Sequence, residues 1–142
     1  MLQLTRLVYS SRHRDLQPET VDDILEKSRI NNLRDGITGA LIVSDRSFMQ
    51  LLEGERDAVA KCLLRLLGDP RHDDIRILCA GDAEHRLFAE WSMHLIQTSG
   101  IKREILSRYE IDGSFAPEKM TQAAIEDLCK VLSKDDWEEI AA

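Results

Sequence analysis

The chain opens with alternating apolar and polar residues and then changes to helical spacing, which predicts a strand followed by a helix. In residues 2–10, Leu7 and Tyr9 lie on one side and Val8 on the other, as successive side chains of a strand do. From Pro18, which suits a first helical turn, apolar residues recur every three or four positions up to residue 29 or 30. The chain is therefore predicted to begin with a strand and a helix.

The next seventy residues predict a hairpin, a second helix and two further strands. The predicted strands cover residues 40–43, 48–52, 75–80 and 91–96, and the predicted helix covers residues 59–67. That helix should stop before Pro70, because a residue that precedes proline avoids helical geometry. Alternation along the last strand places Trp91, Met93 and Leu95 on one face and Ser92 and His94 on the other.

The predicted order βαββαββ indicates an α+β fold of the ferredoxin-like kind. A mixed five-stranded sheet would carry both helices on one face, because each helix has one apolar stripe to bury. The other face needs a cover, and apolar spacing predicts helices at residues 102–109 and 118–132. We therefore expect a first domain over residues 1–98 and a C-terminal helical extension over residues 99–142 that packs on the sheet.

Composition narrows the classes of function. A chain of 142 residues, 43% hydrophobic and 32% charged, has the size and balance of a globular domain. Its net charge of −7 disfavours direct nucleic-acid binding, because an acidic surface repels phosphates. The sequence has no run of about 18 apolar residues and no leader pattern, so we expect a cytoplasmic protein that does not enter the membrane.

No enzyme motif and no metal site is predicted. The three cysteines are widely spaced and the histidines lack ligand spacing, so neither a metal nor a dithiol centre is expected. The glycine-rich dinucleotide motif, the phosphate-binding loop and the serine hydrolase elbow are all absent. We expect a protein that is not an enzyme.

Two polar residues in apolar strands need an explanation. Gln50 lies within Phe48–Leu52, and a buried amide without partners costs roughly 1–3 kcal/mol. Tyr9 follows Leu7 and Val8, and a buried phenol usually finds an acceptor such as an amide oxygen. Taken alone, this pattern favours a Tyr9–Gln50 hydrogen bond that only satisfies two core groups.

Other residues also allow both a structural and a functional interpretation. Asn31 and Asn32 follow the predicted helix, where one asparagine would serve as its C-terminal cap or both would face the polar edge of a flat ligand. Arg65, Arg71 and His72 would gather near a phosphate or remain solvated. Trp91 and Met93 are more typical of a core than of a cofactor contact.

Seven motifs taken together resemble the BLUF family of blue-light sensors that use FAD. They occur in one continuous order within residues 3–96, and the remaining residues resemble the helical tail of short, stand-alone members. The motifs are LVYSS at residues 7–11, ILEKS at 24–28, NN at 31–32, GITG at 36–39, FMQLLEG at 48–54, DPRH at 69–72 and WSM at 91–93. Each motif is weak evidence alone, and their joint order makes the resemblance specific.

The resemblance implies that FAD lies between the two helices with its ring near the sheet. Tyr9 would donate an electron and a proton, Gln50 would be the switching amide, and Asn32 would bind the polar edge of the ring. Trp91 and Met93 would carry the signal onward. The complete set implied to contact the cofactor is Tyr9, Ile24, Ser28, Asn31, Asn32, Ile37, Phe48, Gln50, Arg65, Asp69, Arg71, His72 and Met93.

Since no catalytic domain follows in this sequence, the output is expected to pass to a separate protein partner or to act through self-association, with a homodimer or higher homo-oligomer expected. Two alternatives stay open. One is a light-independent protein-interaction module in which the Tyr9–Gln50 pair is structural. The other is a small flavin oxidoreductase, against which the absence of a nicotinamide motif argues.

Overall fold

The computed structural model describes residues 3–13, 17–70, 73–134 and 136–139. Its strands are β1 (Leu4–Arg12), β2 (Thr38–Val43), β3 (Ser47–Glu55), β4 (Asp73–Asp82) and β5 (His94–Gln97). Its helices are α1 (Pro18–Asp35), α2 (Arg56–Leu67), α3 (Arg103–Leu106) and α4 (Gln122–Leu132), with short 3-10 turns at η1 (Thr98–Gly100) and η2 (Pro117–Lys119). Within the described ranges, no helix combines the length and the apolar character needed to span a membrane.

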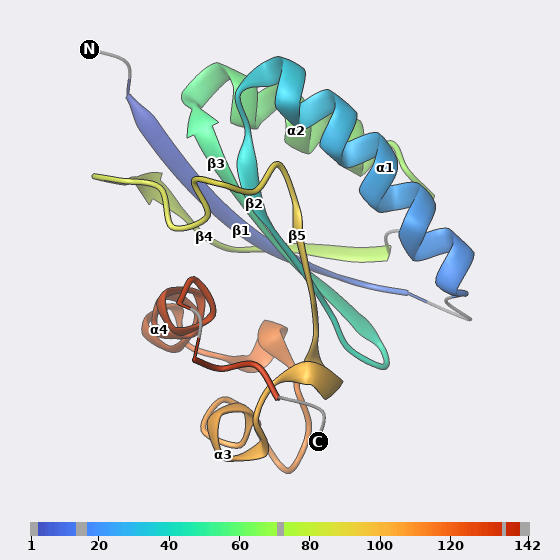
Figure 1. Ribbon diagram of the computed structural model, residues 1–142, viewed down its shortest axis with the longest axis vertical. Coiled ribbons are helices and arrows are strands. Elements are labelled where there is room, and N and C mark those ends of the chain that lie inside the picture. The colour runs from blue at the N-terminus through green and yellow to red at the C-terminus, as the bar shows by residue number, and fades with distance from the viewer. Residues whose placement is uncertain (1–2, 14–16, 71–72, 135, 140–142) are drawn as a thin grey trace.

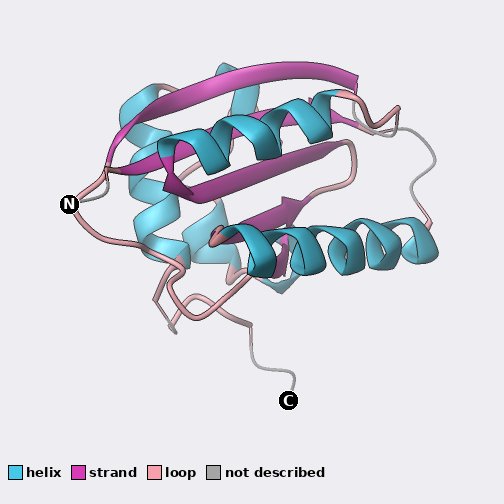
Figure 2. Cartoon of the chain, turned by 90° about the horizontal axis from the view of Figure 1, so that it is seen from above, coloured by secondary structure: helices cyan, strands magenta, loops and turns pink. Residues whose placement is uncertain are grey.

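The five strands form one mixed sheet in the order β4-β1-β3-β2-β5. Strand β1 pairs antiparallel with β3 and β4, and β2 pairs antiparallel with β3 but parallel with β5. Helices α1 and α2 lie side by side over one face, and the C-terminal helices lie on the other side (Figures 1 and 2). The predicted α+β fold, with a mixed five-stranded sheet and two helices on one face, is confirmed.

The sheet separates two hydrophobic cores, because successive side chains of a strand point to opposite faces. The core beneath α1 and α2 contains Leu7, Tyr9, Val21, Ile24, Leu25, Ile37, Leu41, Val43, Phe48, Leu52, Val59, Cys62 and Met93. The core beneath the C-terminal segment contains Val8, Ala40, Ile42, Met49, Leu51, Phe88, Ile96, Ile101, Leu106, Tyr109, Ile125, Leu128, Cys129, Leu132 and Trp137. We call these the helix-side core and the cap-side core.

Helix α1 is longer than predicted, and this changes the position of the asparagine pair. The helix runs to Asp35 and ends at Gly36, which adopts a left-handed conformation (φ 70°) and donates its backbone N–H to the Asn32 carbonyl. Glycine takes this conformation without the steric penalty that a side chain would impose. Asn31 and Asn32 therefore lie inside the last turns of the helix, and their interpretation as a C-terminal cap was wrong.

Strand β5 begins three residues later than predicted. The Ser92 carbonyl accepts a hydrogen bond from Asn32 Nδ2 (2.7 Å) and the Met93 carbonyl accepts one from Arg29 Nε (3.0 Å). Side chains of α1 thus occupy carbonyls of the segment that leads into the strand. As a result, Trp91 and Met93 do not share a strand face: Met93 is fully buried, whereas Trp91 is 46% exposed.

The C-terminal segment is helical but is more divided than its apolar spacing predicts. Instead of a helix over residues 102–109, α3 has only four residues. Helix α4 begins at Gln122 rather than at residue 118, because residues 117–119 form a 3-10 turn and Thr121 caps the helix. The Thr121 hydroxyl accepts a hydrogen bond from the backbone N–H of Ala124 at 3.1 Å, as an N-cap threonine does.

Candidate functional site

Tyr9 and Gln50 form a buried hydrogen-bonded pair at the centre of the sheet. They are direct partners in the antiparallel register of β1 and β3, and neither side chain exposes more than 1% of its surface. The Tyr9 hydroxyl donates to Gln50 Oε1. Burial raises the pKa of Tyr9 well above its ordinary value, and nearby Cys62 and Asp69 raise it further. Tyr9 is therefore a neutral phenol, able to donate a proton.

The hydrogen-bond chain continues from Gln50 to the segment before β5. Gln50 Nε2 donates to the Met93 sulfur at 3.6 Å, and Met93 is fully buried. A thioether is a weak acceptor, so this contact is easily exchanged. The main chain on either side is held firmly, since Asn32 and Arg29 bind the carbonyls of Ser92 and Met93. The chain thus connects a phenol, an amide and a thioether from three separate elements.

A cleft of about 150 Å³ lies between α1 and α2, on the same side of the sheet as this chain. It is lined by Ile24, Lys27, Ser28, Asn31, Asn32, Cys62, Arg65, Leu66 and Asp69. Ile24 and Cys62 also belong to the core that contains Tyr9. The phenol therefore lies on the cleft side of the sheet, in the same core as two residues of the cleft lining.

Six of the nine lining residues are polar or charged, and the other three are Ile24, Cys62 and Leu66. Arg65 Nη2 lies 3.0 Å from Asp35 Oδ2. A hydrogen bond from Arg34 is the main reason why the pKa of Asp35 is lowered. Asn32 turns its amide toward Ser92 and Cys62, whose sulfur lies 3.7 Å from Asn32 Oδ1. An asparagine amide can pair with the polar edge of a ring, and Lys27 and Arg65 can pair with an anionic group.

Most of the residues predicted from the sequence lie together. Ile24, Ser28, Asn31, Asn32, Arg65 and Asp69 line the cleft, Tyr9, Gln50 and Met93 form the chain beneath it, and Ile37 and Phe48 belong to the surrounding core. Trp91 lies apart and is half-exposed, and its ring packs against the His94 ring at a centroid distance of 4.0 Å and a tilt of 31°. Arg71 and His72 lie outside the described residues.

The sequence did not single out Lys27, Cys62 and Leu66 on the cleft wall, nor Arg29 behind Met93. Cys62 and Leu66 occupy ordinary apolar positions of α2, where nothing separates a site residue from a core residue. Lys27 and Arg29 read as solvated charges on α1. Helical spacing carries a usable signal for Lys27, because it lies four positions before Asn31 and therefore on the same helix face.

A larger cavity of about 840 Å³ lies elsewhere, between the β2–β3 turn and the C-terminal segment. It contains none of the residues predicted to bind a cofactor. Its charged groups are partly engaged with one another: Arg103 pairs with Glu110, and Arg12 lies 4.0 Å from Glu118. The smaller cleft, which lies over the Tyr9–Gln50 pair, is therefore the candidate site.

The fold and this site define a small ligand-binding domain with a proton-donating pair beneath its cleft. Residues 4–94 match the family described as BLUF, sensors of blue-light using FAD. The match covers most of the chain and includes every strand that builds the candidate site. The chain belongs to the BLUF family of flavin-binding blue-light photoreceptors.

Curated relatives are longer proteins. The chain is 33% identical over 92 residues to the photoactivated adenylate cyclase subunit beta of Euglena gracilis, covering 63% of this chain and 11% of that protein. It is 32% identical over 93 residues to the blue light- and temperature-regulated antirepressor BluF of Escherichia coli (strain K12), covering 65% of this chain and 23% of that protein. The chain thus spans about a tenth to a quarter of these relatives.

Several solved structures match nearly the whole chain. The photo-activated state of BlsA superimposes with a TM-score of 0.84 at 27% identity, covering 96% of this chain and 99% of that chain. The dark-state structure of BlrB, a BLUF protein, gives a TM-score of 0.77 at 30% identity, covering 94% and 97%. Both comparisons extend beyond residue 94, so the likeness includes the C-terminal helices.

Proposed function

We propose that this chain is a sensor rather than an enzyme, with FAD as its chromophore and with Tyr9, Gln50 and Met93 as its light-responsive centre. One observation carries the proposal: a buried hydrogen-bond chain of phenol, amide and thioether lies directly beneath the α1–α2 cleft. A bond that only satisfied core groups would not need to continue to a sulfur on another segment. The family match supports the flavin, and Arg65 at the cleft supports a cofactor with a phosphate-bearing tail.

A bound flavin would absorb blue light and, once excited, accept an electron. Tyr9 is placed to supply that electron with its proton, since its hydroxyl remains protonated at any physiological pH and donates to Gln50. Return of the electron and proton to Tyr9 leaves no net chemistry. Asn32 would reach the polar edge of the ring by giving up its bond to Ser92 or to Cys62.

Gln50 would store the light signal in the direction of its amide. In the structure its oxygen faces Tyr9 and its NH₂ group faces Met93. Rotation of the amide, or a change of its tautomer, exchanges a donor for an acceptor at both contacts. The Met93 sulfur has no proton to give, so an amide oxygen that faces it makes no hydrogen bond. Met93 is then released from β3, and the segment before β5 loses one of its anchors.

The remaining parts of the proposal concern the output. Residues 1–98 would bind the chromophore, and residues 99–142 would pass the change to a separate protein or to a second copy of this chain in a homodimer or higher homo-oligomer. Ile96 of β5 belongs to the same cap-side core as Leu128 and Leu132 of α4, and this shared core supports the route.

Absorption spectroscopy of the purified chain tests the proposal. The protein is reconstituted with an equimolar mixture of FAD and FMN, and unbound flavin is removed. Its spectrum is recorded in darkness and under blue light, and the bound flavin is then released and identified by mass. We expect a flavin spectrum that moves slightly to the red in light and recovers in darkness. Gln50→Leu should retain the flavin but lose the shift, whereas Gln97→Leu, at an exposed glutamine of β5, should keep it.

Other outcomes select among the alternatives. A protein that does not bind flavin after reconstitution would sink the proposal and favour a light-independent binding module. A flavin that bleaches without a red shift would favour redox chemistry. Release of FMN alone would correct the cofactor but leave the light-responsive centre as proposed.

A further inference from the structure

A buried carboxylate lies on the same strand as Gln50 but points to the opposite face. Glu53 is fully buried on β3, and its oxygens accept four hydrogen bonds. Glu53 Oε1 accepts from the backbone N–H of Leu87 (2.6 Å) and from Arg6 Nε (3.3 Å). Glu53 Oε2 accepts from the backbone N–H of Phe88 (3.0 Å) and from the Thr38 hydroxyl (3.0 Å). These donors fill the roughly four acceptor positions that the two oxygens of the side chain offer.

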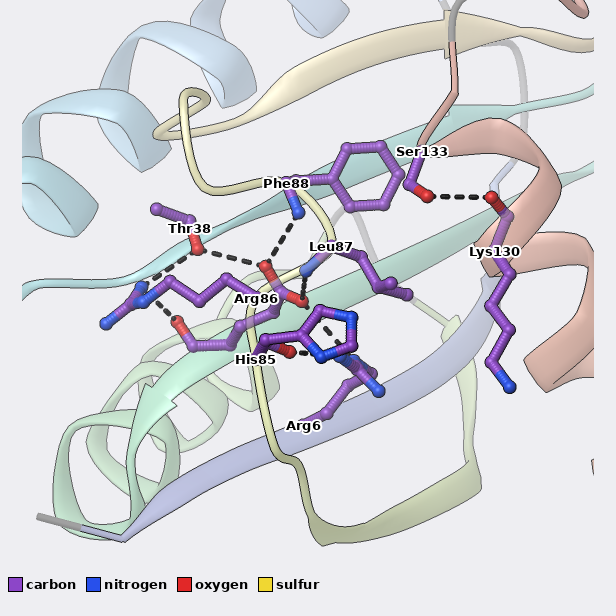
Figure 3. A network of polar contacts seen from close by, with 9 residues as sticks. Arg6, Thr38, His85, Arg86, Leu87, Phe88, Lys130 and Ser133 are labelled. Carbon is purple, nitrogen blue, oxygen red and sulfur yellow. Dashed lines mark hydrogen bonds and ion pairs between the residues drawn. The ribbon is translucent and has the colours of Figure 1, made fainter.

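Two arginines extend this contact into a clamp on the loop between β4 and β5. Arg6 Nη2 donates to the His85 carbonyl at 2.7 Å, so the Arg6–Glu53 pair holds main-chain groups of His85, Leu87 and Phe88. Arg86 reaches back from the loop to the Gly36 carbonyl (2.9 Å), the Thr38 hydroxyl (2.8 Å) and the Glu53 carbonyl (3.1 Å). We call this group of side chains, Arg6, Thr38, Glu53 and Arg86, the Glu53 clamp (Figure 3).

The clamped loop connects the two cores. At its start, Phe88 points away from the clamp toward α4 (Figure 3) and is buried in the cap-side core. Five residues later, Met93 lies in the helix-side core against Gln50. Between them, the Trp91 carbonyl accepts the backbone N–H of Gly39 at 3.1 Å. Residues 85–93 thus form a tied segment with one end at the light-responsive centre and the other under the cap.

The need for stability alone does not explain the Glu53 clamp. Burying a charged pair costs desolvation energy, and well-packed apolar residues of similar volume often serve stability equally well or better. What a fully bonded carboxylate adds is a single defined position for the groups that it holds. A loop held in one position transmits a displacement at one end to the other, whereas a loose loop absorbs it.

We propose that Glu53 is a positioning residue for signal transfer, which fixes the 85–88 loop so that release of Met93 shifts Phe88 and loosens α4. The inference rests on the proposed function, since it names the route by which the rearrangement of Gln50 reaches the cap. Glu53 itself does not contact the cleft or the Tyr9–Gln50 pair, because it points to the cap side of the sheet.

The test uses the full chain with bound flavin and the variant Glu53→Gln. Glutamine keeps the size of the side chain, but its single carbonyl oxygen offers about two acceptor positions in place of four. The red shift in light should persist, because the chromophore side is untouched. Hydrogen exchange of residues 122–132, measured as light minus dark, should fall by about fivefold or more, the lower end of ordinary coupling between sites.

Two further variants serve as a control and as a milder change to the clamp. Glu55→Gln alters an exposed carboxylate on the same strand and should leave both readouts as in the unmodified chain. Thr38→Val removes one donor to Glu53 while preserving the shape of the side chain, and should lower the light-dependent exchange in α4 by about twofold. It takes the place of Glu53→Gln if that variant does not fold.

Each result has a defined meaning. If the unmodified chain shows no red shift, the proposed function fails first. If it shows the shift and an exchange change in α4 that Glu53→Gln and Thr38→Val leave intact, the positioning role is wrong. The role is also wrong if α4 does not respond to light in the unmodified chain, or if Glu53→Gln abolishes the red shift itself. Loss of the α4 response with the shift retained supports it.

Discussion

The Tyr9–Gln50 bond can be measured by a double-mutant cycle. Tyr9→Phe removes the donor to a buried amide oxygen, and Gln50→Leu removes that acceptor together with the weak contact to Met93. Breaking one partner of a buried hydrogen bond costs about 1–3 kcal/mol in the free energy of unfolding. If the two changes acted independently, the double variant would lose about 2–6 kcal/mol. Once one substitution has removed the bond, the second cannot remove it again. We therefore expect the loss of the double variant to be smaller than that sum by about 1–3 kcal/mol.

The assay is chemical denaturation in darkness at a saturating flavin concentration. Flavin affinity is measured for each variant, and its contribution to the stability is subtracted, since a ligand that binds only the folded state stabilises it. Tyr109→Phe is the matched control, because the Tyr109 hydroxyl donates to Asp127 at 2.5 Å in the cap, away from the cleft. That control should keep the red shift, which both single variants at the site should lose. Additivity within about 0.5 kcal/mol would refute a direct bond between Tyr9 and Gln50.

Three further predictions concern the frame around the site. Gly39→Ala should lower the free energy of unfolding by about 1–3 kcal/mol or more, because a Cβ there would lie 1.9 Å from the Leu51 carbonyl oxygen. Thermal unfolding measures this loss, with Gly81→Ala as the control because nothing lies within 4 Å of a Cβ at that position. Leu128→Ala, at a fully buried cap position, should cost about 2–5 kcal/mol in denaturant yet leave the dark flavin spectrum unchanged, and an altered spectrum would contradict the separation of the two cores. Burial lowers the pKa of His94 in the folded protein. The neutral ring therefore contributes its full stabilisation above the ordinary histidine pKa of about 6.5, and this contribution is lost as the pH falls through the lower pKa of the folded state. Unfolding measured across this range should show a shallower acid slope for His94→Gln, and equal slopes would contradict the assignment.

Local patterns predicted the elements well because strand and helix periods are properties of neighbouring residues. Alternation along residues 48–52 places Gln50 on the same strand face as Phe48 and Leu52, and the structure buries all three side chains. The ends of elements were less predictable because distant groups decide them. Helix α1 continues to Asp35, and β5 starts late because side chains of α1 bind carbonyls about sixty positions away along the chain.

The Glu53 clamp could not be predicted from the sequence. A glutamate near the end of a strand normally reads as a solvated charge. Its partners Arg6, Leu87 and Phe88 lie 47, 34 and 35 positions away, and two of them contribute only main-chain groups, which have no sequence signature. The orientations of Trp91 and Met93 were hidden for a similar reason, since strand alternation does not apply to residues that precede the strand.

Because β2 and β3 are buried on both faces, the sheet presents two apolar surfaces that meet different requirements. The surface under α1 and α2 borders the candidate site, whereas the surface under the cap packs against apolar side chains of the C-terminal segment. The family match ends at residue 94, before the cap begins, and one relative that matches 92 residues of this chain is a photoactivated adenylate cyclase subunit. A sheet with two apolar faces allows the cover on one face to differ between relatives while the packing under α1 and α2 is kept.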